Sequence, residues 1–213
     1  MRATARVTAL MLVAACLSGP VLAQSPPATI TQTPAAPPAT PAPPVQGARP
    51  TLVPEPGDPV NVDDVVLPAK PVLILSGSGG WDDGLKILKA AFARIEAQLA
   101  TAGIAPAGRP IAVFTQTNDD TFKYEAMVPI AATPSPAPTL PPEMRFGTTP
   151  GGKAYRFTHK GAYDDIDTTY ETITTYLEAK DIVAKDVFLE EFVNDPKDAA
   201  DTNAEINIYV QPK

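Results

Sequence analysis

The sequence predicts an α+β fold made of two β-α-β-β units in tandem, behind a leader that forms no core. The apolar pattern changes from period two to period 3.6 and back twice, in the same order. The two stretches match at a constant offset through their helices. The chain has 213 residues, 26 of them proline, and no aromatic residue precedes Trp81. About 150 C-terminal residues therefore remain for one ordinary domain.

Residues 1–23 are predicted to be a secretory signal peptide. Arg2 and Arg6 precede an apolar run that is too short to span a membrane, and small residues follow up to Ala23. Cleavage after Ala23 would remove the only cysteine, Cys16, which is consistent with an exported, thiol-free chain. The predicted location is periplasmic or secreted.

An alternative leader is a bacterial lipoprotein signal. Residues 13–16 read Val-Ala-Ala-Cys, which resembles a lipoprotein box. Acylation of Cys16 would then anchor the mature chain, and a membrane is expected as a partner only in this case.

Residues 24–60 are predicted to be a disordered spacer rich in proline and alanine. Twelve of the residues 24–59 are proline, and only Arg49, Glu55 and Asp58 are charged there. Such a segment buries too little apolar surface to offset the cost of ordering its backbone. The folded domain is therefore expected over residues 61–213.

The charge balance argues against a nucleic-acid partner. The formal net charge is −7, and loss of Arg2 and Arg6 with the signal peptide makes the mature chain more acidic still. An acidic chain repels polyanions and attracts cations. No helix-turn-helix pattern is present, so we expect a stand-alone binder of small molecules, with its oligomeric state left open.

The first half-unit, residues 62–131, is predicted to hold a strand, a glycine-rich turn, a helix and two more strands. In order, these are residues 72–75, residues 77–80, the helical stripe Leu88, Ala91, Phe92, Ile95 and Leu99, residues 111–116 and residues 122–130. Gly103 is expected to stop the helix. The glycine-rich turn lacks the spacing of a phosphate-binding loop.

The second half-unit, residues 143–213, repeats this order after a proline-rich connector at 134–142. Its elements are a strand with Tyr155, Phe157 and His159 on one face, the helical stripe Ile166, Tyr170, Ile173 and Leu177, and strands at 187–193 and 205–210. The helices match at an offset of 78 residues. The matched pairs are Leu88 with Ile166, Phe92 with Tyr170, Ile95 with Ile173, Leu99 with Leu177 and Ile104 with Ile182. Each unit has one helix for one sheet face, so a partner unit or a ligand must cover the other.

The strand at 187–193 carries the strongest signal for a binding site. Phe188, Glu190 and Phe192 share one face, whereas the other face is aliphatic apart from Glu191. We expect the aliphatic face to pack on the helix and Glu191 to be a surface charge. A carboxylate between two rings suits a lipophilic cation. The alternative is that Glu190 points into solvent at the rim of the sheet.

In the last strand, Glu205 and Tyr209 are expected to lie with, or near, the Glu190 face. A glutamate beside a tyrosine is a workable acid–base pair. Such residues are more often the wet side of a sheet, so we assign no catalytic residue.

The remaining polar residues favour structural roles. His159 is the only histidine and is expected to be hydrogen-bonded in a turn, so no metal site or cofactor is predicted. Asp82 and Asp83, and likewise Asp164 and Asp165, are placed to cap the two helices.

Several motifs in the second half resemble one known family. These are Lys153-Ala154-Tyr155, Phe157-Thr158-His159-Lys160-Gly161-Ala162-Tyr163, Tyr170, Leu177 and Glu190-x-Phe192-x-Asn194-Asp195-Pro196. They resemble the GyrI-like small-molecule-binding domain, which also serves as the effector-binding half of AraC- and MerR-type bacterial regulators. The resemblance covers roughly residues 62–212.

The resemblance implies two half-units related by a pseudo-twofold axis, with a ligand cleft where they meet. It also implies a buried acidic residue that faces hydrophobic cations in several members, and this residue falls on Glu190. Phe192 stands where tyrosine is usual and Ala162 where proline is usual. The missing hydroxyl at Phe192 weakens the hydrolytic role that a glutamate and a tyrosine have in some relatives.

We therefore expect an exported module that binds hydrophobic and cationic small molecules between its half-units. The candidate ligand-binding residues are Trp81, Tyr163, Phe188, Glu190, Phe192, Glu205 and Tyr209. One alternative is a small hydrolase that uses Glu190 or Glu205 with Tyr163 or Tyr209. Another is a protein-interaction domain whose cleft is filled by its own side chains.

Overall fold

The computed structural model describes residues 49–213, so the predicted signal peptide, Cys16 and most of the predicted spacer lie outside the described residues. The elements follow in the order β1 (Asp63–Leu67), β2 (Pro71–Gly80), η1 (Trp81–Asp83), α1 (Gly84–Thr101), β3 (Ile111–Thr117), β4 (Thr121–Pro129), β5 (Met144–Thr148), β6 (Gly152–Lys160), η2 (Tyr163–Asp165), α2 (Ile166–Ala179), β7 (Ala184–Phe192) and β8 (Glu205–Pro212).

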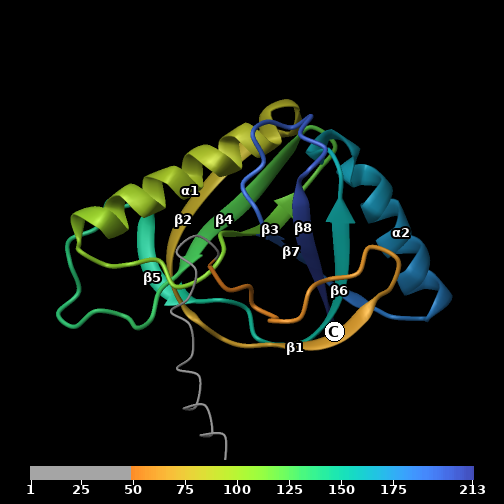
Figure 1. The fold of residues 1–213 in the computed structure, drawn as a ribbon, viewed down its shortest axis with the longest axis horizontal. Coiled ribbons are helices and arrows are strands. Elements are labelled where there is room, and N and C mark those ends of the chain that lie inside the picture. Colours follow the sequence, from red (N-terminus) through yellow and green to blue (C-terminus); the bar gives the residue numbers. More distant parts are fainter. Residues whose placement is uncertain (1–48) are drawn as a thin grey trace, which may run out of the picture. The chain divides into compact units, whose positions relative to one another are not determined.

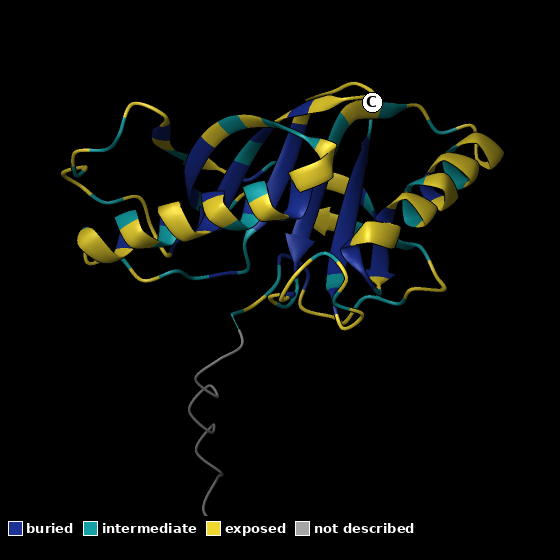
Figure 2. Ribbon diagram, turned by 90° about the horizontal axis from the view of Figure 1, so that it is seen from above, coloured by how far each residue is buried: buried dark blue, intermediate teal, exposed yellow. Residues whose placement is uncertain are grey.

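The eight strands form one antiparallel sheet in the order β1-β6-β8-β7-β3-β4-β2-β5 (Figure 1). Both helices cover the same face of this sheet. Leu88 of α1 and Ile173 of α2 are buried in one apolar cluster with Leu75 of β2 and Phe157 of β6. The burial colours of Figure 2 show blue strands behind helices whose outer surfaces are yellow. The fold is therefore α+β, as predicted.

The predicted element order occurs twice, as β2-α1-β3-β4 and β6-α2-β7-β8. The two halves share one continuous sheet, because β3 pairs with β7 at the seam. The helices end 78 residues apart, at Thr101 and Ala179, but they begin 82 residues apart, at Gly84 and Ile166. The extra turn lies at the start of α1. The pseudo-twofold relation stays a prediction.

Two short edge strands, β1 and β5, were not predicted. Each has five residues, and neither has the clear alternation that identifies a longer strand. They pair with β6 and β2, and so extend each half of the sheet outward.

The glycine-rich segment at 77–80 is the end of strand β2, so the predicted glycine-rich turn is wrong. Residues 76–80 pair in register with β4. A Cβ atom on Gly77 would collide with the ring of Tyr124, and one on Gly79 would collide with Ile87. The glycines are present because neighbouring side chains cross close above the strand.

The aspartates at the helix starts do not cap the helices through their side chains. The structure gives no side-chain capping hydrogen bond at either α1 or α2. Asp82 and Asp83 instead form the turn η1, and Asp164 and Asp165 form η2. His159 does have the predicted structural role, because its ring nitrogens lie 2.8 Å from Thr169 Oγ1 and 2.9 Å from Ala162 O.

The sheet face opposite the helices is covered by the last residues of the predicted spacer. Leu52 is 4% exposed and Val53 is 8% exposed, in a cluster that includes Leu189 and Tyr209. The Arg156 guanidinium also donates to the backbone oxygen of Glu55 at 2.6 Å. The packed chain therefore begins before residue 61, because the second sheet face needs an apolar cover.

Truncation of Leu52 should destabilise the domain. We expect Leu52→Ala to lower the free energy of unfolding by about 2–3 kcal/mol, since a buried leucine loses its contacts and leaves a cavity. Val60→Ala, in the same segment but 87% exposed, should change it by less than about 0.5 kcal/mol. Urea unfolding followed by circular dichroism measures both, and equal midpoints would contradict the packing of this segment.

Candidate functional site

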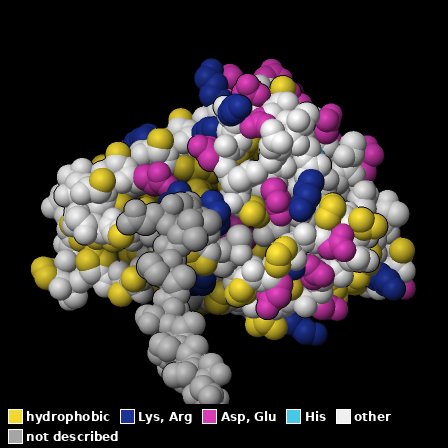
Figure 3. All heavy atoms as spheres, in the orientation of Figure 1, with side chains coloured by type: hydrophobic (Ala, Val, Ile, Leu, Met, Phe, Trp, Pro, Cys, Tyr) yellow, Lys and Arg dark blue, Asp and Glu magenta, His cyan; other side chains and the backbone are white. Residues whose placement is uncertain are grey.

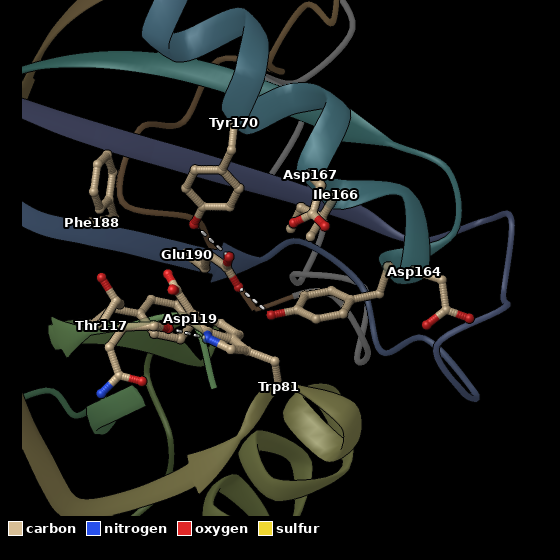
Figure 4. Close-up of a pocket in the computed structure, with 12 residues that line it drawn as sticks. Trp81, Thr117, Asp119, Asp164, Ile166, Asp167, Tyr170, Phe188 and Glu190 are labelled. Atoms are coloured by element: carbon tan, nitrogen blue, oxygen red, sulfur yellow. Dashed lines mark hydrogen bonds between the residues drawn. The ribbon is translucent and has the colours of Figure 1, made fainter. Parts of the chain in front are cut away.

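A cavity of about 510 Å³ lies where the two halves of the sheet meet (Figure 4). Its walls come from both halves of the repeat. The lining residues are Trp81, Phe114, Thr117, Asn118 and Asp119 from the first half, and Tyr163, Asp164, Ile166, Asp167, Tyr170, Phe188 and Glu190 from the second.

Glu190 is held near the middle of the sheet and points into this cavity (Figure 4). On β7 it pairs with Ala112 of β3 on one side and Ile208 of β8 on the other. Glu190 is only 1% exposed. Tyr163 Oη donates to Glu190 Oε2 at 2.9 Å, and Tyr170 Oη donates to Oε1 at 2.7 Å.

Two phenylalanines of β7 hold these tyrosines in place. Phe192 stacks against Tyr163 with a centroid distance of 6.2 Å, and Phe188 meets Tyr170 edge to face at 5.6 Å. Such aromatic pairs stabilise a fixed ring geometry. The two phenols are therefore pre-positioned above the carboxylate.

The opposite wall is built from aromatic residues of the first half. The Trp81 ring lies 5.7 Å from Phe114 and 4.5 Å from Phe122, and its Nε1 donates to Asn118 O at 2.9 Å. Trp81 is 41% exposed, so one side of the indole remains open. The cavity thus has rings on both walls and a carboxylate at its floor.

Burial raises the pKa of Glu190 to about 7, although the hydrogen bonds from Tyr170 and Tyr163 act in the opposite direction. Burial, together with the nearby Glu190 charge, also holds the pKa of both phenols well above the usual value. Near neutral pH the carboxylate can therefore be present in either form, whereas the phenols stay protonated and keep donating.

The ionisable residues that line the cavity are all acidic or phenolic. Asp119, Asp164, Asp167 and Glu190 contribute carboxylates, and no lysine, arginine or histidine is among the lining residues. Lysines and arginines elsewhere are interspersed with acidic side chains on the face seen in Figure 3. The cavity therefore carries a local negative charge.

Four of the seven predicted binding residues line this cavity: Trp81, Tyr163, Phe188 and Glu190. Phe192 does not line it, but lies beside it and supports Tyr163. The expectation that Glu190 points into solvent at a sheet rim is wrong, because it is buried at the central seam.

Glu205 and Tyr209 lie on the other face of the sheet, so their placement near Glu190 is wrong. Tyr209 pairs with Leu189, not with Glu190, and side chains alternate along a strand. Its hydroxyl donates to Glu191 at 2.7 Å. Glu205 forms an ion pair with Lys160 at 3.4 Å. These residues cannot act as an acid–base pair with Glu190 in the cavity.

The prediction of which face of β7 packs on the helices is also wrong. The face with Phe188, Glu190 and Phe192 packs toward the helices. Glu191 is 1% exposed, not a surface charge, because Leu52 N donates to it at 2.6 Å and Tyr209 also donates to it. No sequence pattern indicated that residues before position 61 would cover this face.

Several lining residues were not among the predicted binding residues, notably Tyr170, Phe114, Asp119 and Asp167. Tyr170 was assigned to the apolar stripe of the helix, where only its hydroxyl could have indicated a polar role. Asp119 belongs to a turn between strands, and its proximity to the second half depends on the β3–β7 pairing.

A second cavity of about 390 Å³ adjoins the first along Trp81, Tyr163 and Asp164. It differs in charge, because its lining includes basic as well as acidic residues. These are Lys86, Lys89 and Lys197 together with Asp82, Asp83, Asp164 and Asp198.

Within residues 49–213, no group of three or more histidine, cysteine, aspartate or glutamate side chains is arranged to hold a metal ion. Among the same described residues, none of the helices is both long enough and apolar enough to cross a membrane.

Comparisons with known proteins agree with this architecture. A family model described as GyrI-like small molecule binding domain matches residues 61–213. No curated protein sequence matches the chain significantly.

Solved structures show the same fold at low sequence identity. EcmrR in its DNA complex superposes with a TM-score of 0.58 at 14% identity, over 72% of this chain and 58% of the EcmrR chain. The isolated EcmrR C-terminal domain gives the same TM-score over 98% of its length. A hydrolase encoded by lin2189 from Listeria innocua gives 0.51 at 9% identity, over 79% of this chain and 94% of the hydrolase.

Replacement of Glu190 should change how stability depends on pH. The native carboxyl binds a proton more tightly than the unfolded one, so the wild-type free energy of unfolding should fall as pH rises from 4.5 to about 7. Glu190→Gln removes this loss and should be more stable than wild type by about 1–3 kcal/mol at pH 8, with little difference at pH 4.

Urea unfolding at pH 4, 6 and 8 measures this effect. Glu178→Gln, at an exposed position of α2, serves as the control and should follow the wild-type profile. A Glu190→Gln profile parallel to wild type would contradict the burial of an ionisable Glu190.

Proposed function

The chain belongs to the GyrI-like small-molecule-binding domain family, and we propose that it binds hydrophobic, cationic small molecules in the 510 Å³ cavity. In this proposal Glu190 holds the cationic group, while the rings on the two walls enclose the apolar part of the ligand. The observation that carries the proposal is a carboxylate buried at the floor of an accessible cavity without a basic partner.

The Glu190 carboxylate accepts fewer hydrogen bonds from the described residues than it could accept. Each carboxylate oxygen accepts one hydrogen bond from a phenol, whereas an ionised carboxylate can accept about four hydrogen bonds. None of the ion pairs among residues 49–213 includes Glu190. A bound cation would compensate the buried charge that burial alone disfavours.

The walls of the cavity suit an aromatic or aliphatic cation. Trp81 and Phe114 face the cavity from the first half, and Tyr163, Tyr170 and Phe188 from the second. Rings attract cations over their faces and bury apolar area at the same time. A small inorganic cation has no apolar surface to bury against these rings.

We propose that this binding takes place outside the cytoplasm. The support is the signal-like pattern of residues 1–23, which ends at Ala23. The alternative is a lipoprotein anchored through Cys16. Mass spectrometry of the N-terminus of the protein from its native host would distinguish cleavage after Ala23 from acylation of Cys16.

A second candidate function is hydrolysis, supported by the raised pKa of Glu190. A carboxyl group with a pKa of about 7, beside the Tyr163 hydroxyl, can serve as a general base or acid near neutral pH. A structural neighbour is described as a hydrolase. The pairs that involve Glu205 or Tyr209 are excluded, because those residues lie outside the cavity.

The binding function is tested by calorimetric titration with tetraphenylphosphonium. Since only the ionised carboxylate attracts the cation, and since the pKa of Glu190 is about 7, affinity should be about tenfold weaker at pH 6 than at pH 8. Glu190→Gln should lower affinity at pH 8 by at least about tenfold and remove the pH dependence.

Glu205→Gln is the matched control for this titration, because Glu205 lies on the opposite face of the sheet. Its affinity and pH dependence should equal those of wild type. Equal affinity of wild type and Glu190→Gln for the cation would contradict the proposed function.

The hydrolytic alternative is tested with p-nitrophenyl esters as activated substrates. If Glu190 is the base, the rate should rise with pH around 7, and Glu190→Gln should lower it by about 100-fold or more. Tyr163→Phe should also slow the reaction. Product release at the same rate in wild type and Glu190→Gln would dismiss this candidate.

A further inference from the structure

Two carboxylates lie on opposite walls at the rim of the 510 Å³ cavity, called the main cavity below. Asp119 lies in the turn between β3 and β4, on the wall with Trp81, and Asp167 lies in the first turn of α2, on the wall with Tyr170 (Figure 4). Both are exposed, and both line the cavity whose floor is Glu190. In the part of the chain that the structure describes, neither belongs to an ion pair.

The charge of Asp167 reaches the interior of the cavity. After burial and Glu190, the Asp167 carboxylate also contributes to raising the pKa of the Tyr163 and Tyr170 phenols. The Asp167 charge therefore acts on the two phenols that donate hydrogen bonds to Glu190. Asp164 is less suitable, since Figure 4 shows its carboxylate directed away from Glu190.

The adjoining second cavity offers no comparable negative charge. Its lysines offset its aspartates, and Lys89 is already held by Asp195 at 2.9 Å and by the backbone oxygen of Pro196. A second positive charge on a ligand would therefore be attracted only weakly along that route. It would be attracted toward Asp119 and Asp167, because no basic side chain lines the main cavity.

From this arrangement we infer that the cavity prefers organic dications, in which two positive groups are joined by an apolar spacer, over monocations of the same size. One cationic group would lie at Glu190 and the other between Asp119 and Asp167 at the rim. The inference rests on the proposed function and adds a specificity-determining role for the two rim aspartates.

The expected size of the preference for dications follows from the exposure of Asp119 and Asp167 to solvent. Ion pairs with exposed carboxylates are weakened by water and salt, so two of them should improve affinity by about three- to tenfold at low ionic strength. The gain should shrink in concentrated salt, whereas the contribution of buried Glu190 should be screened much less.

A matched pair of aromatic amidines separates charge from size. The dication is 1,5-bis(4-amidinophenoxy)pentane, and the monocation has a carboxamide in place of one amidine. An amidinium donates N–H groups, which Glu190 can accept because each of its oxygens has only one hydrogen bond from the described residues. Calorimetric titration at 50 mM and 500 mM NaCl gives both affinities.

The dication should bind about three- to tenfold more tightly than the monocation at 50 mM NaCl, and less than about threefold more tightly at 500 mM. Asp119→Asn with Asp167→Asn should lower the affinity of the dication more than that of the monocation, so that the two ligands bind about equally. Asp64→Asn, at an exposed position of edge strand β1, controls for the loss of a surface carboxylate outside the cavity and should keep the preference.

The outcomes separate this inference from the proposed function. Equal binding of dication and monocation, or a preference that survives the double aspartate substitution, would overturn the inference while Glu190-dependent monocation binding still upheld the function. If neither amidine binds in a Glu190-dependent manner, both fail. A preference that disappears with the rim aspartates and persists in Asp64→Asn supports the inference.

Discussion

The burial of one carboxylate at the seam of a continuous sheet is the constraint on which the rest of the site depends. Glu190 lies opposite Ala112, where β3 of one half pairs with β7 of the other. A buried carboxylate is costly unless it accepts hydrogen bonds, and here two phenols donate to it. Each carboxylate oxygen accepts one hydrogen bond from a phenol, so the proposed binding of a cation depends on the acceptor capacity that remains.

The second half of the chain contributes Glu190 and the two tyrosines that donate to it, and the first half contributes the opposite wall of the cavity. The tyrosines come from η2 and α2 and are fixed by phenylalanines of β7. The opposite wall depends on Trp81, which is held by Phe114, Phe122 and the Asn118 carbonyl. Neither half alone encloses a cavity. Continuity of the sheet across β3 and β7 therefore brings residues of the two units around one cavity.

Adjacent residues of β7 serve opposite faces of the sheet. Glu190 points to the cavity, whereas Glu191 accepts hydrogen bonds from Leu52 and Tyr209 on the other side. Period-two alternation correctly predicted that Phe188, Glu190 and Phe192 share a face. It could not tell which face meets the helices, since both faces are buried, and this led to the wrong placement of Glu205 and Tyr209. Alternation shows which residues share a face within a strand, but the pairing of distant strands decides what each face meets.

The sequence by itself determined the α+β class, the repeated order of elements, the family resemblance and the shared strand face of Glu190 and its flanking rings. These depend on local periodicity and on short motifs, which are readable along the chain. Only the tertiary structure decided that the halves join into one sheet, that Leu52 and Val53 complete the domain, and that Tyr170, Asp119 and Asp167 surround the cavity. These features arise from contacts between residues far apart in sequence, and such contacts are set by how the whole chain buries its apolar surface and satisfies its polar groups.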